Sequence, residues 1–178
     1  RQGKILNLDL QKSLIDINLK DDKKIIKSKI KTKGTSKYTE IKMLSSLLGL
    51  DLKDIKNIEL TSNLETSVML WMNEGFKIIK KDYSVNGIIN NLNLEHKEIK
   101  NIKKFFPSYN SKIILKDSKV SIDKVNNLKL SGLVNFDKEF NDFLIKYSGL
   151  NEKNFRVSGK INLQELSLKI PNLNYSKE

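Results

Sequence analysis

The chain has 178 residues, a length sufficient for one domain with an apolar core. Its formal net charge of +12 comes almost entirely from lysine, because Arg1 and Arg156 are the only arginines, and aromatic residues make up only 7% of the chain. Arginine and aromatic side chains are what proteins use to read and stack on bases, so this composition argues against a nucleic-acid binder. The absence of cysteine excludes disulfides, thiolate metal sites and a cysteine nucleophile.

Apolar residues at every second position indicate strands with one apolar face. Residues 6–10 and 15–19 alternate in this way, and the short connection between them predicts a hairpin. A third alternating run ends at the turn-like sequence Gly34-Thr35-Ser36, and Asn63 is a turn candidate between two further runs. Because alternation is already present at Leu6, we expect the chain to be a segment of a longer protein.

A tight polar turn at Asn73-Glu74-Gly75 predicts a hairpin in the middle of the chain. Just before it, Trp71 has the parity opposite to that of Val68, Leu70 and Met72, so its indole lies on the other face. The alternatives there are a helix, lipid or solvent, and of these we expect packing against a short helix. Later alternating runs bring the total to about ten to twelve strands. They lie at residues 83–94, 113–122, 128–136, 155–163 and 166–170.

Three segments have helical spacing instead. Residues 40–50 follow a possible N-cap at Thr39, and residues 98–106 stop at Pro107. Residues 137–148 carry apolar side chains at 140, 143, 144 and 147 and end at Gly149. The fold class predicted from these elements is all-β, mainly antiparallel, with two or three short helices. We expect one β-rich unit over residues 1–178, built as an extended, curled sheet or groove, with a β-sandwich as the alternative.

A short motif recurs three times, with the form apolar, Ser or Asn, Gly, any residue, apolar, Asn. The copies lie at residues 85–90, 130–135 and 157–162. Each glycine has the apolar parity of its strand, and glycine within a strand weakens it. Its recurrence therefore predicts a bend, a bulge, or the close approach of a backbone or a ligand to that face. A curvature role in a strongly coiled sheet is the equal alternative.

Catalytic groups are not evident in the sequence. The single histidine, His96, is expected to be solvated at a strand-to-helix junction. No hydrolase, phosphate-binding or dinucleotide-binding motif is present, and the aspartate clusters lack the spacing and the glycine of a calcium loop. We therefore expect no catalytic residue, no metal site, no cofactor and no enzymatic activity.

At its glycine-centred motifs the chain resembles the AsmA-like superfamily of Gram-negative envelope proteins. Residues 155–163, followed by the alternating residues 166–170, resemble the recurring strand pairs of that superfamily. The resemblance implies a periplasmic segment of a longer repeat protein, held at the inner membrane by an anchor outside this sequence. It also implies transport of phospholipid toward the outer membrane on an apolar groove, without catalysis and without nucleic acid.

On this hypothesis the residues at the apolar parity face lipid, and each methylene that they bury contributes about 0.8 kcal/mol. A structural or protein-binding β-module is the alternative, and a nucleic-acid binder, suggested only by the charge, comes third. The candidate lipid-facing residues are Val85, Gly87, Ile89, Leu128, Leu130, Gly132, Val134, Phe136, Val157, Gly159, Ile161, Leu163, Leu166, Leu168 and Ile170.

Overall fold

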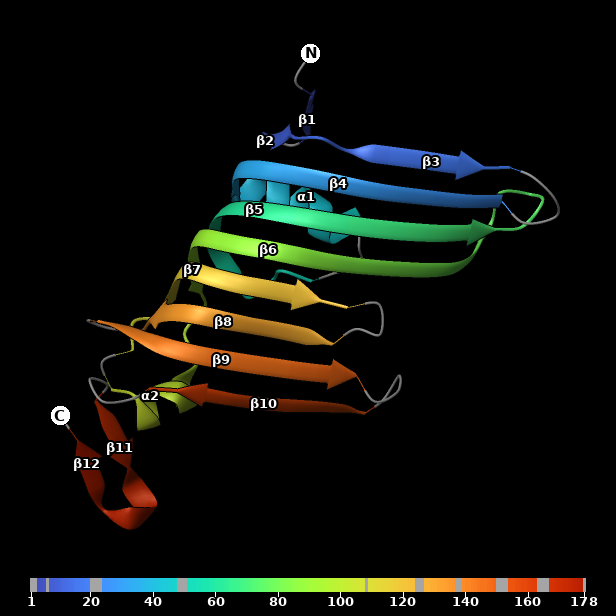
Figure 1. The fold of residues 1–178 in the computed structure, drawn as a ribbon. Coiled ribbons are helices and arrows are strands. Elements are labelled where there is room, and N and C mark those ends of the chain that lie inside the picture. The colour runs from blue at the N-terminus through green and yellow to red at the C-terminus, as the bar shows by residue number, and fades with distance from the viewer. Residues whose placement is uncertain are drawn as a thin grey trace.

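The computed structural model describes residues 3–5, 7–19, 24–47, 51–107, 109–123, 127–136, 139–149, 154–162 and 167–177. Most of them form one open, curled, antiparallel sheet of ten strands, and the remainder include a separate two-stranded hairpin (Figure 1). This confirms the predicted all-β class. The strands of the large sheet are β1 (Gly3–Ile5), β2 (Leu8–Leu10), β3 (Leu14–Asn18), β4 (Lys24–Lys37), β5 (Ile55–Met72), β6 (Ile78–His96), β7 (Lys112–Ile122), β8 (Leu128–Asn135), β9 (Phe140–Gly149) and β10 (Phe155–Ile161).

The remaining elements are short. Helix α1 (Tyr38–Leu47) and helix α2 (Lys100–Phe105) correspond to the first two predicted helices. Strands β11 (Leu168–Ile170) and β12 (Tyr175–Lys177) form the small hairpin around a 3-10 turn at Pro171–Leu173. The curled open sheet, rather than the alternative β-sandwich, is thus the observed arrangement, because the second sheet of the described residues has only these two strands.

The strand order is β1-β2-β4-β5-β6-β7-β8-β9-β10, with β3 also paired to β4. The predicted hairpin between residues 6–10 and 15–19 is therefore wrong. β2 pairs with β1 and with one end of β4, whereas β3 pairs with the other end of β4. The physical reason is the length of β4, which at 14 residues offers room for both short strands along one edge.

Two predicted turns lie inside long strands. β4 continues through Gly34 to Lys37, and β5, which is 18 residues long, continues without interruption through Asn63. Asn63 is paired on both sides, and β4 is paired with β5 through Lys37 and with β2 up to Gly34, so neighbouring strands stabilise an extended backbone that these polar residues would not favour alone. The predicted turn at Asn73-Glu74-Gly75 is confirmed, since it joins β5 to β6.

The third predicted helix, residues 137–148, is wrong. Residues 140–149 form strand β9, paired with β8 on one side and β10 on the other. The apolar spacing that resembled a helix divides between the two faces of the strand. Phe143 and Tyr147 share one face and Phe140 and Leu144 share the other, and ladder pairing on both sides decides between the two patterns.

The recurring glycines lie where strands approach closely. Gly87 and Gly132 have φ values of +157° and +158°, a region that favours glycine. A Cβ on Gly87 would lie 2.9 Å from Cα of Leu64, and a Cβ on Gly132 would lie 2.5 Å from Cα of Ser118. Next to Gly132, β7 has a register shift between Lys116 and Lys119, which bends the sheet. The predicted close approach is thus to protein backbone at these two positions.

Candidate functional site: the apolar face of the sheet

The pairing register divides the side chains of the large sheet between two faces. One face, here called the apolar face, contains two complete rows that cross seven strands. The first row consists of Ile30, Thr66, Val85, Ile122, Leu128, Tyr147 and Val157, and the second of Thr32, Leu64, Gly87, Val120, Leu130, Ile145 and Gly159. Alternation along each strand thus becomes a continuous surface only through the register between strands.

One end of the apolar face is covered. Leu115, Val134 and Phe143 are buried there and form the hydrophobic core, with Leu92 and Phe136 packed against them. Helix α1 contacts β4 and β5 and lies behind them in Figure 1. Ser36 and Ser62 at this end of β4 and β5 are only 3% and 2% exposed. The cluster around Leu115 therefore lies at the end of the sheet that carries the helices, whereas Met72, beside the β5–β6 turn at the other end, is buried separately at 7% exposed.

The other end of the apolar face is open. Ile15 and Ile17 of β3 are 63% and 56% exposed, Tyr83 of β6 is 40% exposed, and Val157 of β10 is 58% exposed. Val68 of β5 and Val85 of β6, which lie between the edge strands β3 and β10, are partly buried. This half, here called the open apolar surface, comprises the row from Ile30 to Val157 and the residues beyond it toward the β5–β6 turn, where most large side chains are hydrophobic.

The predicted lipid-facing residues fall into three groups. Those of β6, β8 and β10 share the apolar face: Val85, Gly87, Ile89, Leu128, Leu130, Gly132, Val134, Val157, Gly159 and Ile161. Of these, Val134 is 2% exposed and belongs to the core, so it is not open to a ligand. Leu130, and Phe136 just after β8, are partly buried and pack against that core.

The last four predicted residues do not extend this face. Leu163 and Leu166 lie outside the described residues. Leu168 and Ile170 belong to β11, which pairs with β12 in the separate hairpin rather than with β10. Pro171 begins the 3-10 turn that reverses the chain directly after Ile170, so this segment folds on itself.

Several residues of the open apolar surface were not among the predicted site residues. Ile15, Ile17 and Tyr83 alternate in the sequence as the predicted residues do, but only the glycine motif drew attention to β6, β8 and β10. Tyr147 was assigned to the third helix, and its ring in fact stacks on that of Phe155 with centroids 5.7 Å apart. Parity alone would have found the first three, whereas Tyr147 required the correct secondary structure.

His96 is not solvated, contrary to the prediction. It is the last residue of β6 and 7% exposed, and its Nε2 forms a hydrogen bond with the hydroxyl of Tyr109. Tyr109 is buried, and burial raises the pKa of its hydroxyl because the charged phenolate would lose its hydration. The edge of its ring meets Phe136, with centroids 6.2 Å apart. The pair closes the covered end of the apolar face.

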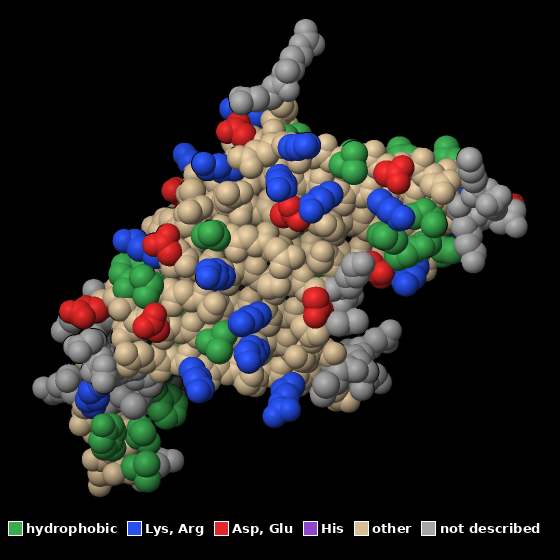
Figure 2. Space-filling view, in the orientation of Figure 1, with side chains coloured by type: hydrophobic (Ala, Val, Ile, Leu, Met, Phe, Trp, Pro, Cys, Tyr) green, Lys and Arg blue, Asp and Glu red, His purple; other side chains and the backbone are tan. Residues whose placement is uncertain are grey.

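The opposite face of the sheet is charged and is here called the lysine face. On β4 it carries Lys27, Lys29, Lys31 and Lys33, and Figure 2 shows basic side chains spread over it, with acidic ones between them. The carboxylate oxygens of Glu65 form ion pairs with Nζ of Lys29, at 2.8 Å, and with Nζ of Lys31, at 3.2 Å. Hydrogen bonds from these two ammonium groups lower the pKa of the Glu65 carboxyl. This face therefore carries paired charges, together with the exposed apolar side chains of Leu14 and Ile88.

Trp71 also lies on the lysine face, so the expected packing of its indole against a helix is wrong. The register places it beside Ile25 and Lys80, and the ammonium of Lys80 lies 4.4 Å from the centre of a Trp71 ring. Helix α1 covers the other face, on which Ser36 and Ser62 are buried. A cation over the indole replaces the predicted helix contact.

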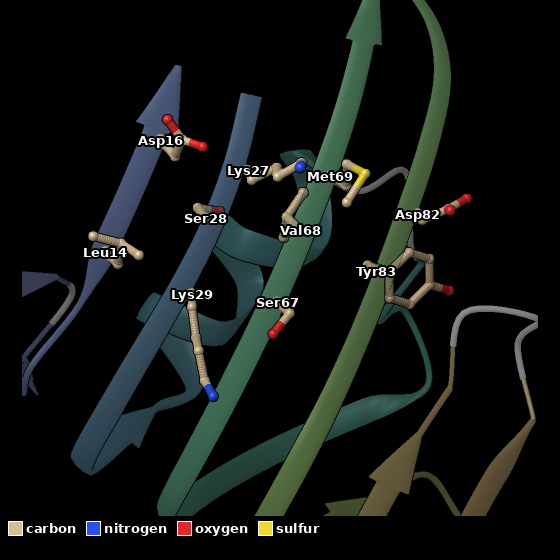
Figure 3. A pocket seen from close by; sticks show the side chains of 10 residues that line it. All are labelled: Leu14, Asp16, Lys27, Ser28, Lys29, Ser67, Val68, Met69, Asp82 and Tyr83. Atoms are coloured by element: carbon tan, nitrogen blue, oxygen red, sulfur yellow. The ribbon is translucent and has the colours of Figure 1, made fainter. Parts of the chain in front are cut away.

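A shallow depression of about 250 Å³ lies on the lysine face between β3 and β6 (Figure 3). Asp16, Lys27, Met69 and Asp82 follow one another across the four strands there. The depression combines carboxylates, an ammonium and a thioether. This mixture of opposite charges and apolar atoms specifies no single ligand chemistry.

Within the described residues, no group of three or more histidine, cysteine, aspartate or glutamate side chains could hold a metal ion. No helix in that part of the chain is long and apolar enough to cross a membrane.

No protein-family model, curated protein or solved structure matches the chain. The class that the fold and surface define is a β-protein built on one large open sheet, with one end of its apolar face uncovered.

Proposed function

We propose that the open apolar surface holds the acyl chains of phospholipid, and that the chain is a non-enzymatic, lipid-conducting segment of a periplasmic envelope protein of the AsmA-like kind. The observation that carries this proposal is the partly buried row from Ile30 to Val157 across seven strands, together with exposed aliphatic side chains on the edge strands, Ile15 and Ile17 of β3 and Val157 of β10. Exposed apolar surface of this continuity marks an interaction site.

The dimensions of the surface support an acyl ligand. Six strand spacings separate β4 from β10 in the sheet order, which at about 4.8 Å each gives roughly 29 Å. One leaflet of a bilayer has a hydrocarbon thickness of about 15 Å, half that of the bilayer core. An acyl chain lying across the strands would therefore contact several rows of aliphatic side chains, and the hydrophobic effect would hold it without hydrogen bonds.

In this proposal the two faces have separate roles. The apolar face shields the tails, and the lysine face keeps the sheet hydrated in the periplasm. An anchor elsewhere in the parent protein would hold the segment at the inner membrane, and transport toward the outer membrane would need only exchange along a continuous apolar surface.

The first test is identification of bound lipid. The chain should be expressed in a Gram-negative host, purified without detergent and extracted for mass spectrometry. The proposal expects phospholipid at a fixed ratio to protein. A protein that elutes free of lipid, and that takes up no fluorescent phosphatidylethanolamine from vesicles, would contradict it.

The second test uses two neighbouring residues of β6 that lie on opposite faces. Val85 is part of the open apolar surface, whereas Asn86 is exposed on the lysine face and accepts a hydrogen bond from Ser121. Val85→Asp adds a charge to the proposed site and is expected to weaken lipid binding at least tenfold. Asn86→Asp adds the same charge to the other face and is expected to leave lipid binding unchanged.

A protein-binding β-module is the second candidate, favoured by the same exposed side chains, which an amphipathic segment of a partner could cover. It is distinguished by its ligand. Retention of a partner protein together with failure to take up phospholipid would favour this candidate over lipid transport.

A further inference from the structure

Three strands of the large sheet have a free edge, the three-residue β1 and the longer β3 and β10, and the two longer ones are unusually exposed. Among the described residues, β3 pairs only with β4 and β10 pairs only with β9. Every residue of both strands is exposed. Six of them are large hydrophobic residues, and the most exposed of these are Leu14 at 67%, Phe155 at 65% and Ile15 at 63%.

Such edges expose unpaired backbone N–H and C=O groups, which attract strands of other chains. Proteins that remain monomeric blunt their edges with lysine, proline or bulges. β3 contains neither lysine nor proline, and its only charged residue is Asp16. β10 carries Arg156 and Lys160 and no acidic residue. The edges therefore have opposite charges.

We infer that β10 of one molecule pairs with β3 of a second copy, so that the sheet continues from molecule to molecule. The strand directions permit this. β3 is antiparallel to β4, and the six successive antiparallel steps from β4 to β10 give β10 the direction of β4. β10 is thus antiparallel to the β3 of a copy in the same orientation, and the apolar faces of the two copies lie on the same side.

The residue pattern selects one register. Only one antiparallel alignment overlaps all five residues of β3 with β10 and also keeps both apolar faces together. It places Ile17 opposite Val157, Ile15 opposite Gly159 and Asp16 opposite Ser158. Arg156 and Lys160 then lie diagonal to Asp16, within reach of its carboxylate because both side chains are long.

Pairing between identical edges is disfavoured by charge. Two β3 strands in full antiparallel overlap place Asp16 opposite its own copy, and two β10 strands place Arg156 opposite Lys160. Like charges directly opposite each other destabilise a sheet. The head-to-tail contact is therefore preferred, and a contact of this kind repeats into rings or filaments. It joins the open apolar surfaces of successive copies whether or not they hold lipid.

The test is analytical ultracentrifugation over a concentration series. The wild-type chain is expected to form a ladder of oligomers. Asp16→Lys is expected to be monomeric, as is the double variant Arg156→Asp/Lys160→Asp, because each makes the two edges alike in charge. An equimolar mixture of these variants should associate again, since each edge then meets its opposite. Asp54→Lys, on an exposed turn, is the matched control and should associate like the wild type.

Cysteine cross-linking checks the register, because the natural chain has no cysteine. Oxidation is expected to link molecules carrying Ile17→Cys to molecules carrying Val157→Cys, and not to molecules carrying Ser158→Cys, which lies on the other face. A wild-type chain that is monomeric at all concentrations would overturn the inference and leave the edges to strands of other proteins. Association that persists unchanged in Asp16→Lys, with circular dichroism showing a folded variant, would also overturn it.

Discussion

Ser118 of β7 occupies the space that Gly132 of β8 leaves free. Ser118 is fully buried, it lies at the register shift of β7, and its hydroxyl donates a hydrogen bond to the carbonyl of Lys116 at 3.0 Å. Gly132 has φ +158°, and a Cβ added to it would lie 2.5 Å from Cα of Ser118. The bulge of one strand and the glycine of the next are thus a matched pair.

We therefore expect Gly132→Ala to lower the free energy of unfolding by about 1–3 kcal/mol, through strained backbone and displacement of β7. Urea denaturation followed by circular dichroism measures this change. Gly75→Ala is the control, because an added Cβ in that turn has as its nearest neighbour the Asn73 side chain, at 3.6 Å. Equal stability of the two variants would contradict the matched-pair interpretation.

The asymmetry of the sheet predicts which aliphatic residues stabilise the fold. Leu115 is 5% exposed in the core, so Leu115→Ala is expected to lower the free energy of unfolding by about 2–5 kcal/mol. Ile15 is 63% exposed at the open end, and Ile15→Ala is expected to change the free energy of unfolding by less than about 0.5 kcal/mol. A similar loss in both variants, measured by denaturant titration, would mean that the open end is covered in solution.

The single tryptophan reports which face meets lipid. Trp71 lies on the lysine face, so vesicles or micelles containing brominated acyl chains are expected to leave its fluorescence unquenched. In a Trp71→Phe background, Tyr83→Trp places the only indole on the open apolar surface, where the same lipids should quench it strongly. Quenching of Trp71 but not of the new indole would reverse the assignment of the faces.

Because Tyr109 is buried, we expect the protein to lose stability at alkaline pH. Burial raises the pKa of the Tyr109 hydroxyl in the folded state, so the folded protein keeps its proton after the unfolded chain, with a pKa of about 10, has lost it. The contribution of the protonated Tyr109 to the free energy of unfolding is fully present below pH 10, and it is lost as the pH rises through the pKa of the folded state. NMR titration should show Tyr109 ionising at a higher pH than a tyrosine in an unfolded chain.

The matching variant for this prediction is Tyr109→Phe. It removes the ionisable group, so the alkaline loss of stability should shrink. It also leaves Nε2 of His96 without the hydroxyl that it contacts, so stability at neutral pH should fall as well. A variant as stable as the wild type at neutral pH would show that this hydrogen bond contributes little.

The sequence alone predicted what depends on neighbours along the chain. Alternation identified most strands but not β1, β9 or β12, the turn at Asn73-Glu74-Gly75 was located correctly, and α1 and α2 were found from their spacing. Errors arose where long-range pairing competes with local preference. Residues 140–149 have apolar residues at both helical and strand spacing, and only β8 and β10 on either side select the strand.

The same limit applies to the candidate site. Parity in the sequence determined that Val85, Leu130 and Val157 each lie on the apolar side of a strand. Only the tertiary structure decided that they share one surface, that Val134 beside them is buried in the core, and that Leu168 and Ile170 belong to another hairpin. The physical reason is that side-chain direction is a property of the local backbone, whereas burial depends on which strands pair, in which register, and on where the helices cover the sheet.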